Sequence, residues 1–398
     1  MGLRAAICVG PLQLLEQCIF QHSLDAASRF LTMSTLEERL HEQIRTARSD
    51  ADRACLTAQL AAYQARMGNY SGAAEYIREL RTESNLSSPT IAAWIMFAEG
   101  LTLLRDELSR DGFDRMFRGF AIADSAGAAD IGAQLASWLV QISYNQNRYS
   151  EMPRWIAHCN SKIIGKQHET RARLCLTFAD AHRHAGYFEE SNAWYQRVRL
   201  HAAAIGDEAF LSSLMYNRSA NGISRLRYEE VSGIKNSVAA NQLMLEIDSA
   251  LSYSTVTGNK SAHHLQSMWK GRLLMHLERH LEAKSLLSVA SEQMPEAKHA
   301  QLRTSLQADL MLCEAVAGKR SHAVELLQKL NETDLSDLAG DDQSVVIGQI
   351  AAANVLLNYQ LASRDLDNAL QAARLEHERE IQLLRVILRC CDEYVDMQ

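Results

Sequence analysis

Apolar side chains recur along this chain at the spacing of an amphipathic helix, and the apolar runs end at turns that contain glycine. Gly127, Gly165 and Gly206 each follow one such run and precede the next, at intervals of roughly forty residues. A glycine just beyond a helix end supplies the left-handed residue at which the chain turns back. Because a fixed interval of this length is typical of stacked repeats, the pattern predicts an array of helical hairpins.

The pattern divides most of the chain into about eight helix pairs. The first pair is expected over residues 51–66 and 72–80, with a turn at 67–70 between its helices. Further pairs are expected over residues 91–126, 130–164, 168–205, 207–252, 263–293, 298–331 and 343–376. The 207–252 pair contains a weak internal break at 226–229.

Polar stretches indicate how these pairs are grouped. Residues 253–262 are interpreted as a joint between an N-terminal sub-array, 35–252, and a C-terminal sub-array, 263–376. Residues 377–398 are expected to form a charged capping helix, because a terminal repeat must present a polar outer face.

The first helix of the array has a recognisable start. Ser34 or Thr35 can cap it, and Glu37 and Glu38 then lie in its first turn, which is the arrangement of a capping box. Residues 1–34 are therefore interpreted either as an extension that precedes the natural start of the protein or as a leading helix.

The hairpins resemble tetratricopeptide repeats in the residues around their turns. That family places a small residue in the first helix, glycine and an aromatic residue at the turn, and alanine followed by larger apolar residues in the second helix. The best matches are Ala61, Gly68, Tyr70, Ala73, Ile77 and Leu80, and then Ala179, Gly186, Phe188, Ser191, Tyr195 and Val198. The units are longer than those of the family, as in its long-helix variants from bacterial regulators. The resemblance implies an all-α, right-handed superhelical solenoid of antiparallel hairpins.

The composition agrees with an all-α protein, because only 4 of the 398 residues are proline and good helix formers dominate. The net charge of −7, with acids and bases interspersed, provides neither a basic surface for nucleic acid nor a cationic face for anionic lipid. No apolar run is long enough to cross a membrane. The 8 cysteines form no C-x-x-C pair and mostly lie in apolar helical runs, which favours a reducing, cytoplasmic compartment.

No motif of a catalytic centre or cofactor site occurs in the sequence. It contains no G-x-S-x-G, H-E-x-x-H, Rossmann glycine fingerprint or phosphate-binding loop. A non-enzymatic protein without a cofactor is therefore expected. His276 and His280 stand one helical turn apart, a spacing that can bind a metal. Because both lie near a turn, where polar residues are common, we interpret them as ordinary polar residues and expect no metal there.

Polar residues that face the inner side of the predicted array are the candidate binding residues. They are Ser137, Gln141, Asp180, Arg183, Asn217, Asn221, Arg272, Asn354 and Asn358. The asparagines form two pairs spaced i, i+4, so each pair is expected to share a helix face. An amide both donates and accepts, which suits the backbone of an extended peptide. The alternative is that these side chains form a solvated face or cap neighbouring loops.

Two functions fit these expectations. The first is a scaffold or adaptor that holds a protein or an extended peptide in a concave groove. The second is a ligand- or peptide-responsive regulatory module that acts with a separate output protein, because neither end of the sequence carries a helix-turn-helix or a basic segment. A homodimer is compatible with both.

Overall fold

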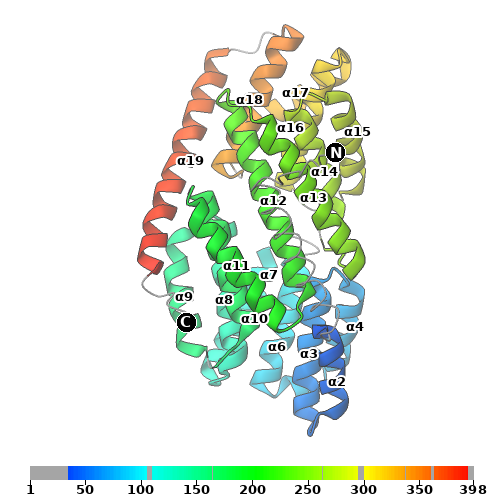
Figure 1. The fold of residues 1–398 in the computed structure, drawn as a ribbon, viewed down its shortest axis with the longest axis vertical. Coiled ribbons are helices and arrows are strands. Elements are labelled where there is room, and N and C mark those ends of the chain that lie inside the picture. The colour runs from blue at the N-terminus through cyan, green and yellow to red at the C-terminus, as the bar shows by residue number, and fades with distance from the viewer. Residues whose placement is uncertain are drawn as a thin grey trace, which may run out of the picture.

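The computed structural model describes residues 35–104, 110–163, 165–261, 263–294, 300–336, 338–359 and 363–392. The predicted leading segment, 1–34, lies outside these residues. Within the described ranges every regular element is a helix and none is a strand, so the all-α class is confirmed there (Figure 1).

The helices of the first half are α2 (Leu36–Thr46), α3 (Asp50–Arg66), α4 (Tyr70–Leu80), α5 (Glu83–Leu86), α6 (Pro89–Thr102), α7 (Arg110–Ser125), α8 (Ala129–Asn145), the 3-10 helix η2 (Tyr149–Glu151), α9 (Met152–Lys162), α10 (His168–His184) and α11 (Phe188–Ala204). Those of the second half are α12 (Glu208–Val231), α13 (Ser237–Thr257), α14 (His263–His276), α15 (His280–Gln293), α16 (Ala300–Val316), α17 (Arg320–Asn331), α18 (Gly340–Leu357) and α19 (Ser363–Asp392).

Consecutive helices pack as pairs from α3 with α4 to α18 with α19, so the predicted hairpins are present in the described residues. The turn glycines Gly127, Gly165 and Gly206 have φ values of 65°, 64° and 56°, which is the left-handed conformation expected of them. At the start of α2, the Thr35 hydroxyl accepts from the Glu38 amide and the Glu38 carboxylate accepts from the Thr35 amide. The predicted capping box is therefore confirmed at Thr35.

Two predicted helix boundaries in the centre of the chain are wrong. The expected break at 226–229 lies inside α12, which continues to Val231 because Leu226 and Arg227 are buried among other helices. The expected joint at 253–262 begins inside α13, which continues to Thr257. Within this helix the hydroxyls of Ser252, Thr255 and Thr257 each donate to the carbonyl four residues earlier, so the polar side chains bond to their own helix and do not form a loop.

The C-terminal boundary also differs from its prediction. The limit between 376 and 377 falls inside α19, one continuous helix of 30 residues. Leu384, Leu388 and Cys391 of α19 are buried in the hydrophobic core of the first half of the chain. The helix packs on α18 and also on η2, α9 and α10, along one edge of the molecule (Figure 1). One face of the helix therefore joins distant hairpins, while charged residues of its other face, such as Glu376 and Arg379, are exposed to solvent as expected.

Helix α12 contributes to the cores of both halves. Phe210 and Leu214 near its start belong to the first core, whereas Ile223 and Leu226 near its end belong to the second. It contacts α10, α13, α14 and α18, and it runs through the middle of the view in Figure 1. Because α12 touches α18 directly, helices that are far apart in sequence lie against each other.

None of the described helices is long and apolar enough to pass through a lipid bilayer. The described cysteines, which are Cys55, Cys159, Cys175, Cys313, Cys390 and Cys391, are all free thiols.

The packing of α19 predicts the effect of removing its buried side chains. Leu384 is fully buried, whereas the adjacent Leu383 is 44% exposed. We expect Leu384→Ala to lower the free energy of unfolding by about 2–5 kcal/mol, because it leaves a cavity in the core. The matched variant Leu383→Ala should lower it by less than about 1 kcal/mol. Equal effects in denaturant unfolding of the two variants would show that α19 is not packed on the first half.

Candidate functional site

The nine predicted inner-face residues do not form a free wall. Five of them are buried, namely Ser137, Gln141, Asp180, Arg272 and Asn354; Arg183, Asn217 and Asn221 are half-buried, and Asn358 is exposed. Asn358 ends α18 in the left-handed conformation, with φ of 48°. It therefore does not share a helix face with Asn354, in contrast to the prediction for that pair.

The other asparagine pair, Asn217 and Asn221, donates hydrogen bonds to a buried carboxylate. Asp180 of α10 accepts hydrogen bonds from Asn217 Nδ2 at 2.8 Å and Asn221 Nδ2 at 3.1 Å, both from α12. The hydroxyl of Tyr195, from α11, donates to the same carboxylate at 2.7 Å. The two asparagines do share a helix face, as predicted, but that face is turned toward Asp180. Their amide groups thus serve a carboxylate of this chain.

Burial raises the pKa of the Asp180 carboxyl to about 6, and the hydrogen bonds from Tyr195 and Asn217 offset only part of that effect. Ser137 and Gln141, on α8, are also occupied within the protein. Ser137 Oγ donates to the Gln134 carbonyl at 2.7 Å, and Gln141 Oε1 accepts from Thr177 Oγ1 at 2.9 Å.

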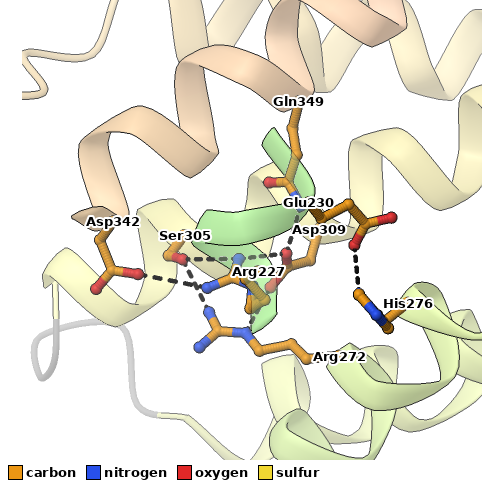
Figure 2. Close-up of polar contacts among 8 residues, drawn as sticks. All are labelled: Arg227, Glu230, Arg272, His276, Ser305, Asp309, Asp342 and Gln349. Atoms are coloured by element: carbon orange, nitrogen blue, oxygen red, sulfur yellow. Dashed lines mark hydrogen bonds and ion pairs between the residues drawn. The ribbon is translucent and has the colours of Figure 1, made fainter. Parts of the chain in front are cut away.

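Arg272 belongs to a second buried cluster, drawn in Figure 2. Its centre is Asp309 of α16, which accepts from Arg272 Nε at 2.8 Å and from Arg227 Nη2 at 2.6 Å. Gln349 Nε2 donates to Asp309 at 2.8 Å, and Arg272 Nη2 donates to Ser305 Oγ at 2.8 Å. Side chains from α12, α14, α16 and α18 therefore meet on one carboxylate.

The charges of this cluster balance one another. Burial by itself raises the pKa of a carboxyl group, but Arg227 and Arg272 outweigh it, and the pKa of Asp309 lies below its ordinary value. Asp342 Oδ1 lies 3.3 Å from Arg227 Nη1. Burial and the neighbouring charge of Asp341 raise the pKa of Asp342. Asp309 thus remains the main counter-ion of the two arginines.

His276, the first member of the predicted histidine pair, is bonded within the chain. His276 Nδ1 lies 2.9 Å from Glu230 Oε2, as Figure 2 shows, and His276 Nε2 accepts from the Asn236 amide at 3.1 Å. Both ring nitrogens of His276 therefore have partners. Among the described residues, no three His, Cys, Asp or Glu side chains come together in a way that could hold a metal ion.

A cavity of about 450 Å³ lies where the ends of α8 and α10 meet α12, α18 and α19. Two of the predicted residues, Arg183 and Asn221, line it. The other walls include His184 of α10, His377 of α19 and Arg385 of α19. Most of the residues that line this cavity carry polar side chains, and they come from both halves of the chain, so we take it as the candidate functional site.

Three arginines and two carboxylates, those of Glu229 and Asp341, line this cavity. Arg225 pairs with Glu229, whereas Arg183 and Arg385 form no ion pair with a described residue. The side chain of Arg183 is half-buried and makes no hydrogen bond or ion pair with any described residue, and its Nε is buried without a partner. Burial lowers the pKa of its guanidinium. Arg385 donates from Nε to the Ala185 carbonyl at 2.9 Å and has no carboxylate partner in the described part of the chain. The cavity wall therefore contains two guanidinium groups, those of Arg183 and Arg385, that are not in an ion pair with a described residue.

Two histidine rings complete this wall. The rings of His184 and His377 stack with centroids 5.7 Å apart. His184 Nε2 and His377 Nδ1 are buried without hydrogen-bond partners, and Glu380 Oε2 lies 3.8 Å from His377 Nδ1. His377 is only 8% exposed. Burial lowers the pKa of His184, so its ring is favoured in the neutral form.

Reasoning from the sequence missed His184, His377 and Arg385 as site residues. His184 is the last residue of α10, and no catalytic or binding motif surrounds it in the sequence. His377 and Arg385 lie in a charged helix that was interpreted as a cap, and about 200 residues separate them from His184. No local pattern marks a contact between such distant segments.

No protein-family model matches the chain, and no curated protein is significantly similar to it in sequence. The function must therefore be argued from the contacts and charges of the chain itself.

The Asp180 cluster predicts that its asparagines are structural. Replacing Asn217 or Asn221 by alanine removes a hydrogen bond to a buried charged group, which costs about 1.5–3 kcal/mol. We expect the double variant to show a clearly lower midpoint in thermal unfolding. Asn241→Ala is the matched control, because Asn241 is exposed on α13 and donates only to the Ser237 carbonyl of its own helix. An unchanged midpoint in the double variant would mean that the amides are free to bind a peptide.

The raised pKa of Asp180 predicts a pH dependence of stability. Because the folded-state pKa of about 6 exceeds the ordinary value of 3.8, the folded state holds this proton more tightly. The resulting stabilisation is complete below pH 3.8 and is lost as the pH rises through 6. Relative to Asp180→Asn, the wild type should lose about 2 kcal/mol of unfolding free energy between pH 4 and pH 7. Denaturant unfolding of both proteins at several pH values measures this difference, and a constant or growing difference contradicts it.

Proposed function

We propose that this chain is a non-enzymatic helical-repeat module, built on the superhelical plan of the tetratricopeptide family, that binds a compact anionic ligand in the cavity beside α12. The observation that carries the proposal is Arg183. This guanidinium is half-buried in the cavity wall and has no carboxylate partner among the described residues. Burying a charge without a partner costs free energy, so an anionic ligand that pairs with this guanidinium would recover part of that cost.

The ligand group that fits best is a carboxylate. A guanidinium offers a planar pair of donors that matches the two oxygens of a carboxylate. Arg385 supplies a second cationic group in the same cavity, and the amide of Asn221 lies beside it. His184 Nε2 and His377 Nδ1 add polar atoms that have no hydrogen-bond partner among the described residues. Together these groups can contact an anionic head. Of the two carboxylates that also line the cavity, Glu229 is paired with Arg225, and Asp341 is the other.

The size of the cavity limits the ligand to a short molecule. A volume of 450 Å³ holds about 15 water-sized groups. A small organic acid or the last two or three residues of a peptide fit this volume. An extended peptide along an open groove fits the geometry less well. The amides of Asn217 and Asn221, which would bind its backbone, are bonded to Asp180. In addition, α18 packs on α12 and α19 packs on α10.

The position of the cavity favours the regulatory alternative over a passive scaffold. Its walls come from α10, α12, α18 and α19, so a bound anion would link the two halves of the chain. Ligand binding to the folded state alone stabilises that state by mass action. A ligand that joins α19 to α10 therefore changes how firmly α19 is held. The output would come from a separate protein that distinguishes the chain with α19 firmly held from the chain with α19 loosely held.

Arg183→Met provides the test of this proposal, because methionine keeps much of the side-chain length and removes the charge. The probes are succinate, citrate, inorganic phosphate, and a mixture of tripeptides with either free or amidated C-termini. We expect at least one probe with a free carboxylate to bind the wild type in calorimetry, with an affinity at least tenfold lower for Arg183→Met. The control is Arg199→Met, an exposed position on α11, which should bind as the wild type does.

The panel also separates the possible sources of the anion. Binding of free but not amidated tripeptides identifies a peptide terminus, whereas binding of succinate or citrate identifies a small organic acid. If no probe binds the wild type, or if Arg183→Met binds as tightly as Arg199→Met, the proposed function is wrong.

A further inference from the structure

A second cavity, of about 340 Å³, adjoins a different face of α12. Its lining includes Val231 of α12, Arg272 of α14, Leu312 of α16, Val345 and Gln349 of α18, and Leu370 of α19. Arg227 and Arg272 of the cluster in Figure 2 form part of its floor. The cavity thus combines an apolar wall with a few buried polar groups, which is the usual composition of a small-molecule site.

The polar floor has unused hydrogen-bonding capacity. Arg272 is 2% exposed, and its Nε and Nη2 are bonded to Asp309 and Ser305, but its Nη1 has no partner among the described residues. Gln349 is 9% exposed, and its Oε1 is buried without a partner. Because only the NH₂ group of Gln349 can donate to the Asp309 carboxylate, the orientation of this amide is fixed and its oxygen is the free acceptor.

The charges of the floor do not call for a charged ligand. Asp309 pairs with both Arg227 and Arg272, and Asp342 pairs with Arg227. The two arginines therefore already face carboxylates, unlike Arg183 in the candidate functional site. An added carboxylate would compete with Asp309, and an added cation would be repelled by the arginines. A neutral group that accepts from Arg272 Nη1 and donates to Gln349 Oε1 fits the floor without either conflict.

The walls require an apolar body of limited length. Val231, Leu312, Val345 and Leu370 surround the space with aliphatic side chains. At Gly348 an added Cβ would lie 2.9 Å from Val231 Cγ1, so α12 and α18 approach each other closely beside the cavity. The volume corresponds to about 11 water-sized or methylene-sized groups. A chain of roughly eight to ten carbons therefore fills it.

We propose that this second cavity binds a neutral, medium-chain apolar molecule that carries one primary amide or hydroxyl group. The head of the ligand accepts a hydrogen bond from Arg272 Nη1 and donates one to Gln349 Oε1. Its tail lies against Val231, Leu312, Val345 and Leu370. The inference does not rest on the function proposed for the cavity lined by Arg183, because the two sites use different residues and select ligands of different charge.

Four eight-carbon probes test the chemical class, namely octanamide, 1-octanol, octanoate and octane. We expect octanamide and 1-octanol to bind and to raise the thermal midpoint. Octanoate and octane should bind at least tenfold more weakly, because the first adds a charge and the second lacks the head group. Tightest binding of octanoate, equal binding of octane, or no binding of octanamide and 1-octanol would overturn the proposal.

Cavity-filling variants locate the site. Ala351 lines this cavity, so Ala351→Phe should occupy the space and weaken octanamide binding at least tenfold. The matched control is Ala203→Phe, at a position of similar exposure on α11 away from both cavities. Arg183→Met should bind octanamide as the wild type does, which separates failure of this inference from failure of the proposed function. Normal octanamide binding by Ala351→Phe would contradict the inference.

A second measurement does not depend on the folding of any variant. A diazirine derivative of 1-octanol, irradiated with the wild-type protein, should label residues in 227–231, 272–280 or 345–352, and excess octanamide should suppress that labelling. Labelling confined to other segments would place the ligand elsewhere and overturn the inference.

Discussion

Three buried carboxylates determine where α12 lies. Asp207, the N-cap of α12, is bonded at 2.8 Å to Arg66 at the end of α3. Asp180 of α10 holds two asparagines from the middle of α12, and Asp309 of α16 holds Arg227 near its end. A buried charge that loses its partner costs about 3–5 kcal/mol, so each of these contacts strongly restricts the positions that α12 can take. The closure of α12 on α18 and the two cavities beside it depend on this arrangement.

The same contacts decide which polar groups remain for a ligand. The asparagine amides and most nitrogens of Arg272 are occupied within the chain, so they contribute to stability and not to binding. Arg183 is left without an acidic partner, and Gln349 Oε1 is left without a donor, among the described residues. These two residues line different cavities and would bind ligands that differ in charge and in hydrogen-bonding groups. An anion suits the first and a neutral donor suits the second, which is consistent with a protein that responds to small ligands.

Features fixed by neighbouring residues could be predicted from the sequence, and features fixed by distant ones could not. Gly127 and Thr35 act within a few residues of themselves, so the turn and the capping box were predicted correctly. The shared face of Asn217 and Asn221 follows from helical spacing alone. Its partner Asp180 lies on another helix, and without it the amides resembled a peptide clamp. The cavity wall contributed by α19 depends on tertiary packing that leaves no local pattern in the sequence.

Native-state hydrogen exchange along α12 tests most directly whether this helix is held from both sides. Amides around Phe210 and Leu214 lie in the first core, and those around Ile223 and Leu226 lie in the second. If the buried carboxylates join both halves through α12, amides at both ends should exchange only on global unfolding, with the same free energy. Exchange of the C-terminal half of α12 at a much lower free energy, together with α18, would show that the two halves open independently and would contradict the account.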